Sequence, residues 1–265
     1  MRVLVVGDTH GNRRWWEFGV LPRAERHEVD LICQVGDFGY WPNRLGRGDA
    51  FLEVVSASPV PVLFVDGNHE DHAALAAAVA EVRARTPLNP TSPVPLGGSL
   101  LYLPRGARLV WGGVRVAALG GAHSIDRRLR RPGVDWFKEE SLTLEDLALL
   151  ASGGPADLLL THDVPAAAPV EGIPVDDMPT AWLSELADSH AHRLLVQEGL
   201  DAVRPSTLIH GHFHTSWYHR LMRPWGACDV HGLDRDGAGE GAFALVECVD
   251  GALTCTRLAR NSDVV

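Results

Sequence analysis

The chain has 265 residues, of which 46% are hydrophobic, and carries a formal net charge of −10 at pH 7. That acidic balance disfavours a protein that coats nucleic acid, although a local basic pocket is still allowed. No apolar run approaches the roughly 20 residues that a membrane helix needs, and the run that starts at Val3 is too short for a signal peptide. We therefore expect a cytoplasmic protein with no membrane partner.

Short apolar runs that stop at turn residues predict buried strands in the first third of the chain. They cover residues 3–7, 30–35 and 61–65, and helical stretches follow them at 13–28, 49–57 and 70–85. Pro22 makes the continuity of the first helix doubtful. The alternation indicates three successive βα units.

The remaining chain predicts an antiparallel meander, a further βαβ unit and terminal hairpins. We expect strands at residues 100–103, 107–111, 114–119, 157–161, 206–210, 217–221, 242–249 and 252–258. Helices are expected from Ser141 or Thr143 to Leu150, and from 181 to 203 with an interruption at Gly199. The four prolines of residues 86–98 predict a loop. The whole order predicts two facing sheets with helices outside, in a single domain over residues 1–265.

The cysteines are Cys33, Cys228, Cys248 and Cys255. Their spacing matches neither a zinc knuckle nor a CxxC redox pair. A two-residue turn at Asp250-Gly251 would place Cys248 opposite Leu253 rather than opposite Cys255. We therefore predict unpaired thiols, as expected in a reducing compartment.

Several of the predicted strands end in a glycine or threonine that is followed by aspartate, asparagine or histidine. Ligands at strand carboxyl ends converge at one edge of a sheet, so these side chains are expected to meet. The donors are Asp8, His10, Asp37, Asn68, His162, His212 and His214. Oxygen and nitrogen donors without a thiolate suit Mn, Fe, Zn, Co or Ni. The set is too large for one tetrahedral ion with an open position, but it suits two ions that share a carboxylate.

In their order along the chain, these blocks resemble the calcineurin-like metallophosphoesterase superfamily. They are Gly7-Asp8-Thr9-His10-Gly11, Gly36-Asp37, Gly67-Asn68-His69-Glu70, Thr161-His162 and Gly211-His212-Phe213-His214. One block alone is weak evidence, whereas the full ordered set is specific. The resemblance implies an α/β fold, a four-layer α/β/β/α sandwich with two facing mixed sheets, which agrees with the predicted elements.

The resemblance also implies a role for each donor. One ion would be held by Asp8, His10 and His214, the other by Asn68, His162 and His212, with Asp37 as the bridge. His69 would protonate the leaving oxygen or steady the transition state. A hydroxide between two divalent ions, with Mn favoured, would attack phosphorus in line.

The chain departs from the protein-phosphatase branch of this superfamily at the residues that handle phosphate. That branch has an acid and an arginine soon after the second motif, where this chain has Phe38-Gly39-Tyr40-Trp41, and an arginine where this chain has Asp66. The acid that would orient His69 is therefore missing. The block Gly120–Arg128 looks like one in bacterial and phage members of unassigned substrate, and with Arg130 and Arg131 it offers replacement anion contacts.

We name Asn12, His123, Arg127 and Arg128 as candidate substrate contacts. Each also has a structural explanation without a role in substrate binding. Asn12 could hold its turn, His123 could simply belong to a loop, and an arginine run is usually a solvated face. His210 alternates with the two histidine donors and is expected to be structural.

The sequence thus predicts a hydrolase of phosphoric esters. Diesters are favoured, because a carboxylate at Asp66 near the site would repel a dianionic monoester more than a monoanionic diester. A phosphomonoesterase and a family member that binds metal without catalysis are the alternatives, and ligand order disfavours an amidase. The expected substrate is a small phosphoester or nucleotide. Nucleic acid is possible but not favoured by the net charge, and the oligomeric state is open.

Overall fold

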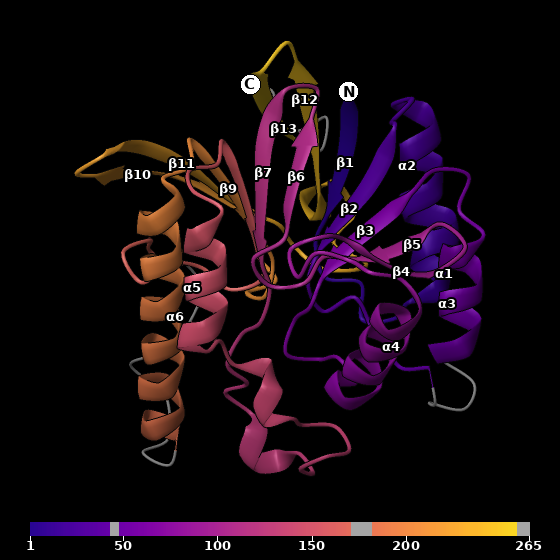
Figure 1. The fold of residues 1–265 in the computed structure, drawn as a ribbon, viewed down its shortest axis with the longest axis horizontal. Coiled ribbons are helices and arrows are strands. Elements are labelled where there is room, and N and C mark those ends of the chain that lie inside the picture. Colours follow the sequence, from indigo (N-terminus) through magenta and orange to yellow (C-terminus); the bar gives the residue numbers. More distant parts are fainter. Residues whose placement is uncertain (43–47, 171–181, 259–265) are drawn as a thin grey trace.

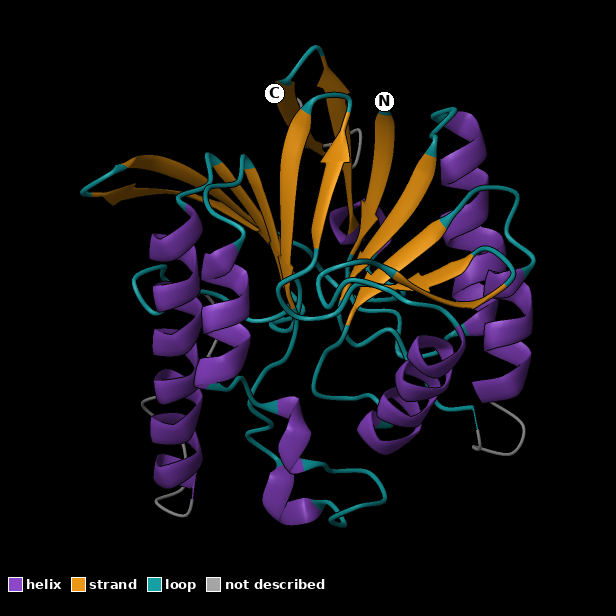
Figure 2. Cartoon of the chain, in the orientation of Figure 1, coloured by secondary structure: helices purple, strands orange, loops and turns teal. Residues whose placement is uncertain are grey.

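The computed structural model describes residues 1–42, 48–170 and 182–258. Two β-sheets face each other, and helices cover the outer face of each sheet (Figure 1, Figure 2). Helices α1 to α4 lie outside the first sheet, and α5 and α6 lie outside the second (Figure 1). This arrangement confirms the predicted four-layer α/β/β/α sandwich.

The first sheet has seven strands in the order β13-β12-β1-β2-β3-β5-β4. Its strands are β1 (Arg2–Val6), β2 (Leu31–Val35), β3 (Val62–Val65), β4 (Val94–Gly97), β5 (Leu100–Tyr102), β12 (Phe243–Val249) and β13 (Ala252–Arg257). Neighbours from β1 to β5 in this order pair in parallel, whereas β12 and β4 pair antiparallel with their neighbours. The central strands are continuously apolar because both of their faces are covered.

The second sheet has six strands in the order β10-β11-β9-β8-β7-β6. Its strands are β6 (Arg108–Trp111), β7 (Val114–Leu119), β8 (Leu158–Thr161), β9 (Thr207–His210), β10 (Trp217–Arg223) and β11 (Gly226–Gly232). The inner strands pair in parallel, and β6 and β10 form antiparallel edges. Both sheets are therefore mixed, as predicted.

The helices mostly follow the predicted ranges. They are α1 (Arg13–Trp15), α2 (Leu21–Arg26), α3 (Gly48–Ser56), α4 (His72–Arg85), α5 (Leu144–Ser152) and α6 (Leu183–Val203), with a π-helix η1 (Trp16–Val20) and short 3₁₀ turns η2 (Arg127–Leu129), η3 (Lys138–Glu140) and η5 (Gly239–Ala242). The first predicted helix is thus divided into three segments. Pro22 lies in the first turn of α2, directly after the π-helix.

Four predictions about elements were wrong. The expected antiparallel meander does not form, because β5 pairs with β3 in the first sheet while β6 and β7 pair with each other in the second. Helix α6 runs through Gly199 without interruption, because the absent side chain lets the helix approach the sheet: a Cβ there would lie 2.8 Å from Leu119 and 3.1 Å from Leu150. Strand β4 forms inside the proline-rich stretch, since an edge strand tolerates Pro95. Strand β11 was missed because its residues, Gly-Ala-Cys-Asp-Val-His-Gly, lack an apolar alternation.

The core between the sheets fixes the strand ends relative to one another. It includes Val5, Cys33, Val65, Val116, Leu160 and Ile209, all buried. All the cysteines are free thiols, and Cys248 pairs with Leu253 across the β12–β13 hairpin, as predicted. Among the helices of the described residues, none is both long and apolar enough to cross a membrane.

Candidate metal centre

The predicted donors follow strands of both sheets, and these strands converge at the centre of the view in Figure 1. The loops that carry them come directly after β1, β2, β3, β8 and β9. Two carboxylates, Asp8 and Asp37, and the imidazole of His162 are buried completely or nearly so. The parallel pairing of β1 with β2, of β2 with β3, and of β8 with β9 explains how residues far apart in sequence meet here.

The first group of donors is Asp8, His10, Asp37 and His214. One ligand atom from each lies within 4.8 Å of the others. His214 Nε2 lies 3.0 Å from Asp8 Oδ2, and His10 Nε2 lies 3.6 Å from Asp37 Oδ2. Two ligands at about 2.1 Å from one ion, at right angles to each other, are about 3.0 Å apart. The spacing therefore fits ligands of a common ion.

A buried nitrogen in this group lacks an ordinary hydrogen-bond partner. His214 Nε2 makes no hydrogen bond to any described residue, although Asp8 Oδ2 is only 3.0 Å away. Buried polar atoms are normally hydrogen-bonded, so such an orphan needs an explanation. A cation placed between the nitrogen and the carboxylate would satisfy both, and the residues present fit a divalent metal ion.

The second group centres on His162. Its Nδ1 donates to the carbonyl of Val35 at 2.9 Å, which leaves Nε2 3.1 Å from Asn68 Oδ1 and 3.3 Å from Asp37 Oδ1. The ring of His212 lies 5.0 Å from that of His162, centroid to centroid. Asp37 therefore faces His10 with one carboxylate oxygen and His162 with the other. This geometry suits a bridging carboxylate, and the division of donors between two ions stays a prediction.

Glycines let the donors approach one another. A Cβ at Gly36 would collide with the ring of His162, one at Gly67 with Asp37, and one at Gly211 with the carboxylate of Asp8. Glycine at these three positions is thus explained by close approach.

Several donors also have unusual backbone conformations. The φ angles of His10, Asp37, His212 and His214 are 47°, 51°, 70° and 52°. The left-handed region costs a residue with a side chain roughly 1–2 kcal/mol. Strain of this kind gathers at functional sites, where surrounding contacts maintain it.

The carboxylates of the site raise the pKa of the histidines beside them. Burial alone would lower the pKa of His10, but Asp236, Asp37 and Asp8 outweigh it and raise the pKa to about 10. Burial also opposes protonation of His162, and Asp37 and Asp8 raise its pKa to about 10. Both imidazoles are therefore in the positively charged, doubly protonated form at neutral pH in the metal-free protein. Metal binding would displace these protons, so metal affinity should depend on pH.

Asp236 is a site residue that the sequence did not reveal. Its Oδ1 lies 2.9 Å from His10 Nδ1, and its Oδ2 accepts a hydrogen bond of 2.6 Å from Asn12 Nδ2. A carboxylate on the far nitrogen of a ligand histidine fixes the direction of the ring. The other end of the Asn12 amide accepts from Trp15 N at 3.0 Å and caps α1. Asn12 thus joins Asp236 to the start of α1, and its role as a substrate contact stays a prediction.

Asn68 is oriented by a short buried chain of hydrogen bonds. Its Nδ2 donates to Ser124 Oγ at 3.0 Å, and that hydroxyl donates to Glu140 Oε2 at 2.7 Å. The backbone N–H of Ser124 donates to Glu140 Oε1, also at 2.7 Å. The amide oxygen of Asn68 is thereby turned toward His162. Ser124, which belongs to the Gly120–Arg128 block, thus affects the candidate metal centre by orienting Asn68.

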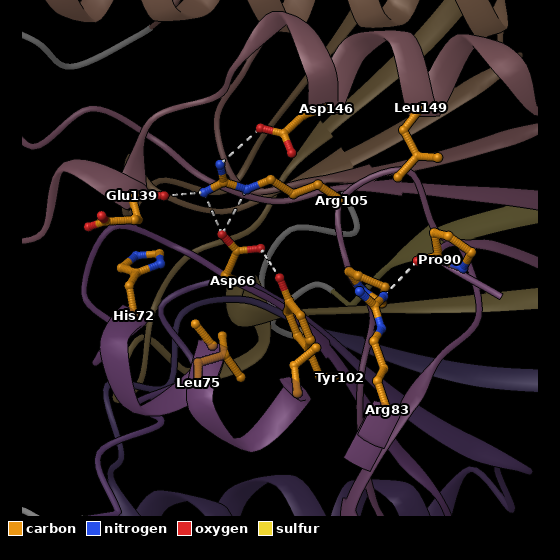
Figure 3. A pocket seen from close by; sticks show the side chains of 13 residues that line it. Asp66, His72, Leu75, Arg83, Pro90, Tyr102, Arg105, Glu139, Asp146 and Leu149 are labelled. Carbon is orange, nitrogen blue, oxygen red and sulfur yellow. Dashed lines mark hydrogen bonds and ion pairs between the residues drawn. The ribbon is translucent and has the colours of Figure 1, made fainter. Parts of the chain in front are cut away.

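Asp66 turns away from the donors and is neutralised. Its carboxylate binds Arg105 at 2.7 Å and accepts from the Tyr102 hydroxyl at 2.9 Å (Figure 3). Arg105 also binds Asp146 and the backbone carbonyls of the segment 139–141. The premise that Asp66 would repel an anionic substrate is therefore wrong, because a buried arginine cancels its charge.

The side chains of His123, Arg127 and Arg128 make their ion pairs with α6 rather than with the donors. Both arginines bind Glu185 near the start of α6, with Nε–oxygen distances of 2.7 Å for Arg127 and 2.6 Å for Arg128. Arg127 also binds Asp188 at 2.7 Å, and His123 Nε2 lies 3.1 Å from Glu185. These contacts tie the loop after β7 to α6. They give no support to the three residues as substrate contacts.

His69 lies beside the first group of donors. Its backbone N–H donates to Asp37 Oδ1 at 2.8 Å, and its Nε2 lies 3.9 Å from Asp37 Oδ2. The same Nε2 is 2.5 Å from Arg130 Nη2, so the imidazole accepts a hydrogen bond from the guanidinium. Burial lowers the pKa of His69, and Arg130 adds to this effect against the opposing charge of Asp37.

A groove of about 760 Å³ opens over the donors. It is lined by His10, Gly11, Asn12, Arg13, Ala50, His69, His214, Arg235 and Asp236. A second hollow of about 210 Å³ shares His69 with the groove and also includes Arg130 and Trp41. The candidate site can thus be reached from the surface by a small molecule.

The profile of the calcineurin-like phosphoesterase family matches residues 1–216 of the chain. No curated protein sequence gives a significant match. Among solved structures, TT1561 of Thermus thermophilus is similar with a TM-score of 0.57 and 16% identity, over 97% of this chain and 99% of that one. At this identity the likeness concerns the fold alone.

Two further solved structures are more loosely similar. A phosphatase from Mycoplasma pneumoniae has a TM-score of 0.42 and 14% identity, over 89% of this chain and 72% of that one. The sulfate thiohydrolase SoxB of Thermus thermophilus has a TM-score of 0.43 and 16% identity, over 94% of this chain and 42% of that one.

Proposed function

The chain belongs to the calcineurin-like phosphoesterase family, and on that premise we propose that it hydrolyses phosphoric esters with two divalent metal ions. One observation carries this proposal: the carboxylate of Asp37 faces His10 with Oδ2 and His162 with Oδ1. A carboxylate shared in this way would hold two ions close enough to act on one phosphoryl group. Mn²⁺ is the first ion to test.

We assign the remaining donors by their neighbours. One ion would be held by Asp8, His10 and His214, the other by Asn68, His162 and His212. When bound, the ions supply an activated water and neutralise the charge of the phosphoryl group. His69, once Nε2 is protonated, is the group that would give a proton to the leaving oxygen. Asp236 would orient the His10 ring for metal binding, and Ser124 would orient the Asn68 amide in the same way.

Within this class we propose that diesters are better substrates than monoesters. Arg127 and Arg128 are neutralised by α6, and Arg130 alone among the arginines of this run contacts His69. The other arginines of the groove, Arg13 and Arg235, are exposed at its rim. One guanidinium beside the ions matches the single charge of a diester better than the charge of about −1.5 to −2 on a monoester.

The proposed substrate is a small phosphoester or nucleotide. A net charge of −10 disfavours extended contact with nucleic acid. We also propose a cytoplasmic location, and the free thiols support it because thiols persist in reducing compartments.

The test compares kcat/KM for bis-p-nitrophenyl phosphate and p-nitrophenyl phosphate at one pH with Mn²⁺. We expect the higher value for the diester. A monoester that is better by tenfold or more would overturn the ester class but leave the hydrolase intact. If neither ester is hydrolysed with Mn, Fe, Zn, Co or Ni, the hydrolase assignment fails and a metal-binding protein without catalysis takes its place.

A further inference from the structure

We propose that Arg130 is the residue that binds an ester oxygen beside His69, and that Asp126 positions it. The inference rests on the proposed function, because it names a substrate contact of the same site. Arg130 Nη2 lies 2.5 Å from His69 Nε2 and 2.8 Å from Asp126 Oδ1. The guanidinium is therefore aimed at the group that would act on the leaving oxygen.

Arg130 differs from the other arginines of its run. Its side chain is 9% exposed, whereas those of Arg127, Arg128 and Arg131 are 34%, 55% and 73% exposed. The three neighbours bind carboxylates on α6 or, for Arg131, on Asp135. Burying a cation is unfavourable unless a partner compensates for the lost water. Asp126 compensates for the burial of Arg130, and the guanidinium is held beside His69, where a substrate anion would lie.

The present partners of Arg130 leave room for such an anion. Asp126 supplies one carboxylate oxygen, and its side chain is 41% exposed, so water weakens its hold on the charge. The second partner is an uncharged imidazole nitrogen, and the third, the carbonyl of Asp135, is 3.5 Å from Nη1. A guanidinium carries five N–H donors in a fixed plane. An ester oxygen beside this pair would accept a hydrogen bond from Arg130, and a second one from His69 once its Nε2 carries a proton.

The adjoining hollow fits the organic part of a substrate. It has a volume of about 210 Å³, and Trp41 and Val134 line it together with His69 and Arg130. Val134 is 55% exposed, which leaves apolar surface open to a substrate. An apolar or aromatic leaving group would pack on these two side chains while its oxygen faces His69 and Arg130. A cation from the loop after β7 would thus replace the arginines that the sequence lacks at Asp66 and after Asp37.

The test compares Arg130→Gln with Arg131→Gln in metal-loaded protein. Arg131 is the matched control, because it is the next arginine in the chain but binds Asp135 near solvent. Calorimetric titration with inorganic phosphate should show binding weakened by roughly 10- to 100-fold in Arg130→Gln, the size of one lost charge-assisted hydrogen bond. kcat/KM for a nitrophenyl ester should fall by a similar factor. Both values should stay within about twofold of wild type in Arg131→Gln, and all three proteins should bind equal metal.

Two further variants separate substrate contact from a structural role. Arg130→Ala leaves a space that added guanidinium chloride, at concentrations below those that unfold the protein, should fill, with partial recovery of turnover. Arg131→Ala should show no such recovery. Asp126→Asn keeps the guanidinium but loosens it, so kcat should fall while metal content and the melting temperature remain those of wild type.

Wild-type phosphate binding and turnover in Arg130→Gln would overturn the inference while the proposed hydrolase stands. Metal loss in that variant would also overturn it, because Arg130 would then support the metal centre instead. A wild-type protein that hydrolyses no ester would refute the proposed function, and the phosphate titration would still decide the role of Arg130.

Discussion

Asp236 accepts a hydrogen bond from His10 across 226 positions of the chain, with 2.9 Å between Oδ1 and Nδ1. This bond fixes the imidazole so that its other nitrogen, Nε2, faces Asp37 at 3.6 Å. The C-terminal part of the chain, which lies beyond the residues matched by the family profile, therefore contributes to the candidate metal centre.

We predict that Asp236→Ala lowers metal affinity by roughly 10- to 100-fold, as is usual for the loss of a carboxylate behind a ligand histidine. The His10 ring would be free to rotate away from Asp37. Competition with a chelating dye measures the effect. Asp234→Ala is the control, because the Asp234 carboxylate accepts from the neighbouring backbone N–H of Arg235. Equal affinity in Asp236→Ala and wild type would contradict the role of Asp236.

We predict that Asp37→Asn abolishes hydrolysis and reduces bound metal in both groups of donors. An amide has one carbonyl oxygen, so it cannot present a charged oxygen to His10 and to His162 at the same time. Chelation of the wild-type protein should give the same loss of activity. Metal content by plasma mass spectrometry checks the prediction, with Asp30→Asn as the control because Asp30 is exposed and bonds Arg2. Full metal content with near-normal turnover would refute a bridging Asp37.

We predict that His69→Ala keeps its metal but slows turnover by about 10²- to 10⁴-fold, the usual size of a general-acid contribution. The loss should be smaller for nitrophenolate than for an alkoxide leaving group, because a weakly basic oxygen needs less protonation. Rates for two esters that differ only in the leaving group provide the comparison. Loss of metal instead would show that His69 is a ligand.

The metal donors could be predicted from the sequence because each lies just after an apolar strand. Parallel pairing brings the ends of such strands together. Asp236 could not be predicted in this way, since a single aspartate in the turn between β11 and η5 carries no periodic signal and meets His10 only through the fold. Arg130 was one of a run of arginines, and the sequence did not show which one turns inward. The prediction for Asp66 failed because a carboxylate after a strand can face either side, and its partner, Arg105, lies 39 residues further along.

We predict that Asp66→Asn destabilises the fold and leaves the ratio of diester to monoester kcat/KM unchanged. Asp66 is 1% exposed and Arg105 is 11% exposed, so removing the carboxylate would leave a buried guanidinium with less charge compensation. Breaking such a buried pair typically costs about 3–5 kcal/mol of folding free energy. Denaturant unfolding measures the loss, and Asp157→Asn, which breaks the exposed pair with Arg115, should cost much less. A changed ester ratio in Asp66→Asn would show that the charge of Asp66 acts on the substrate despite its pairing with Arg105.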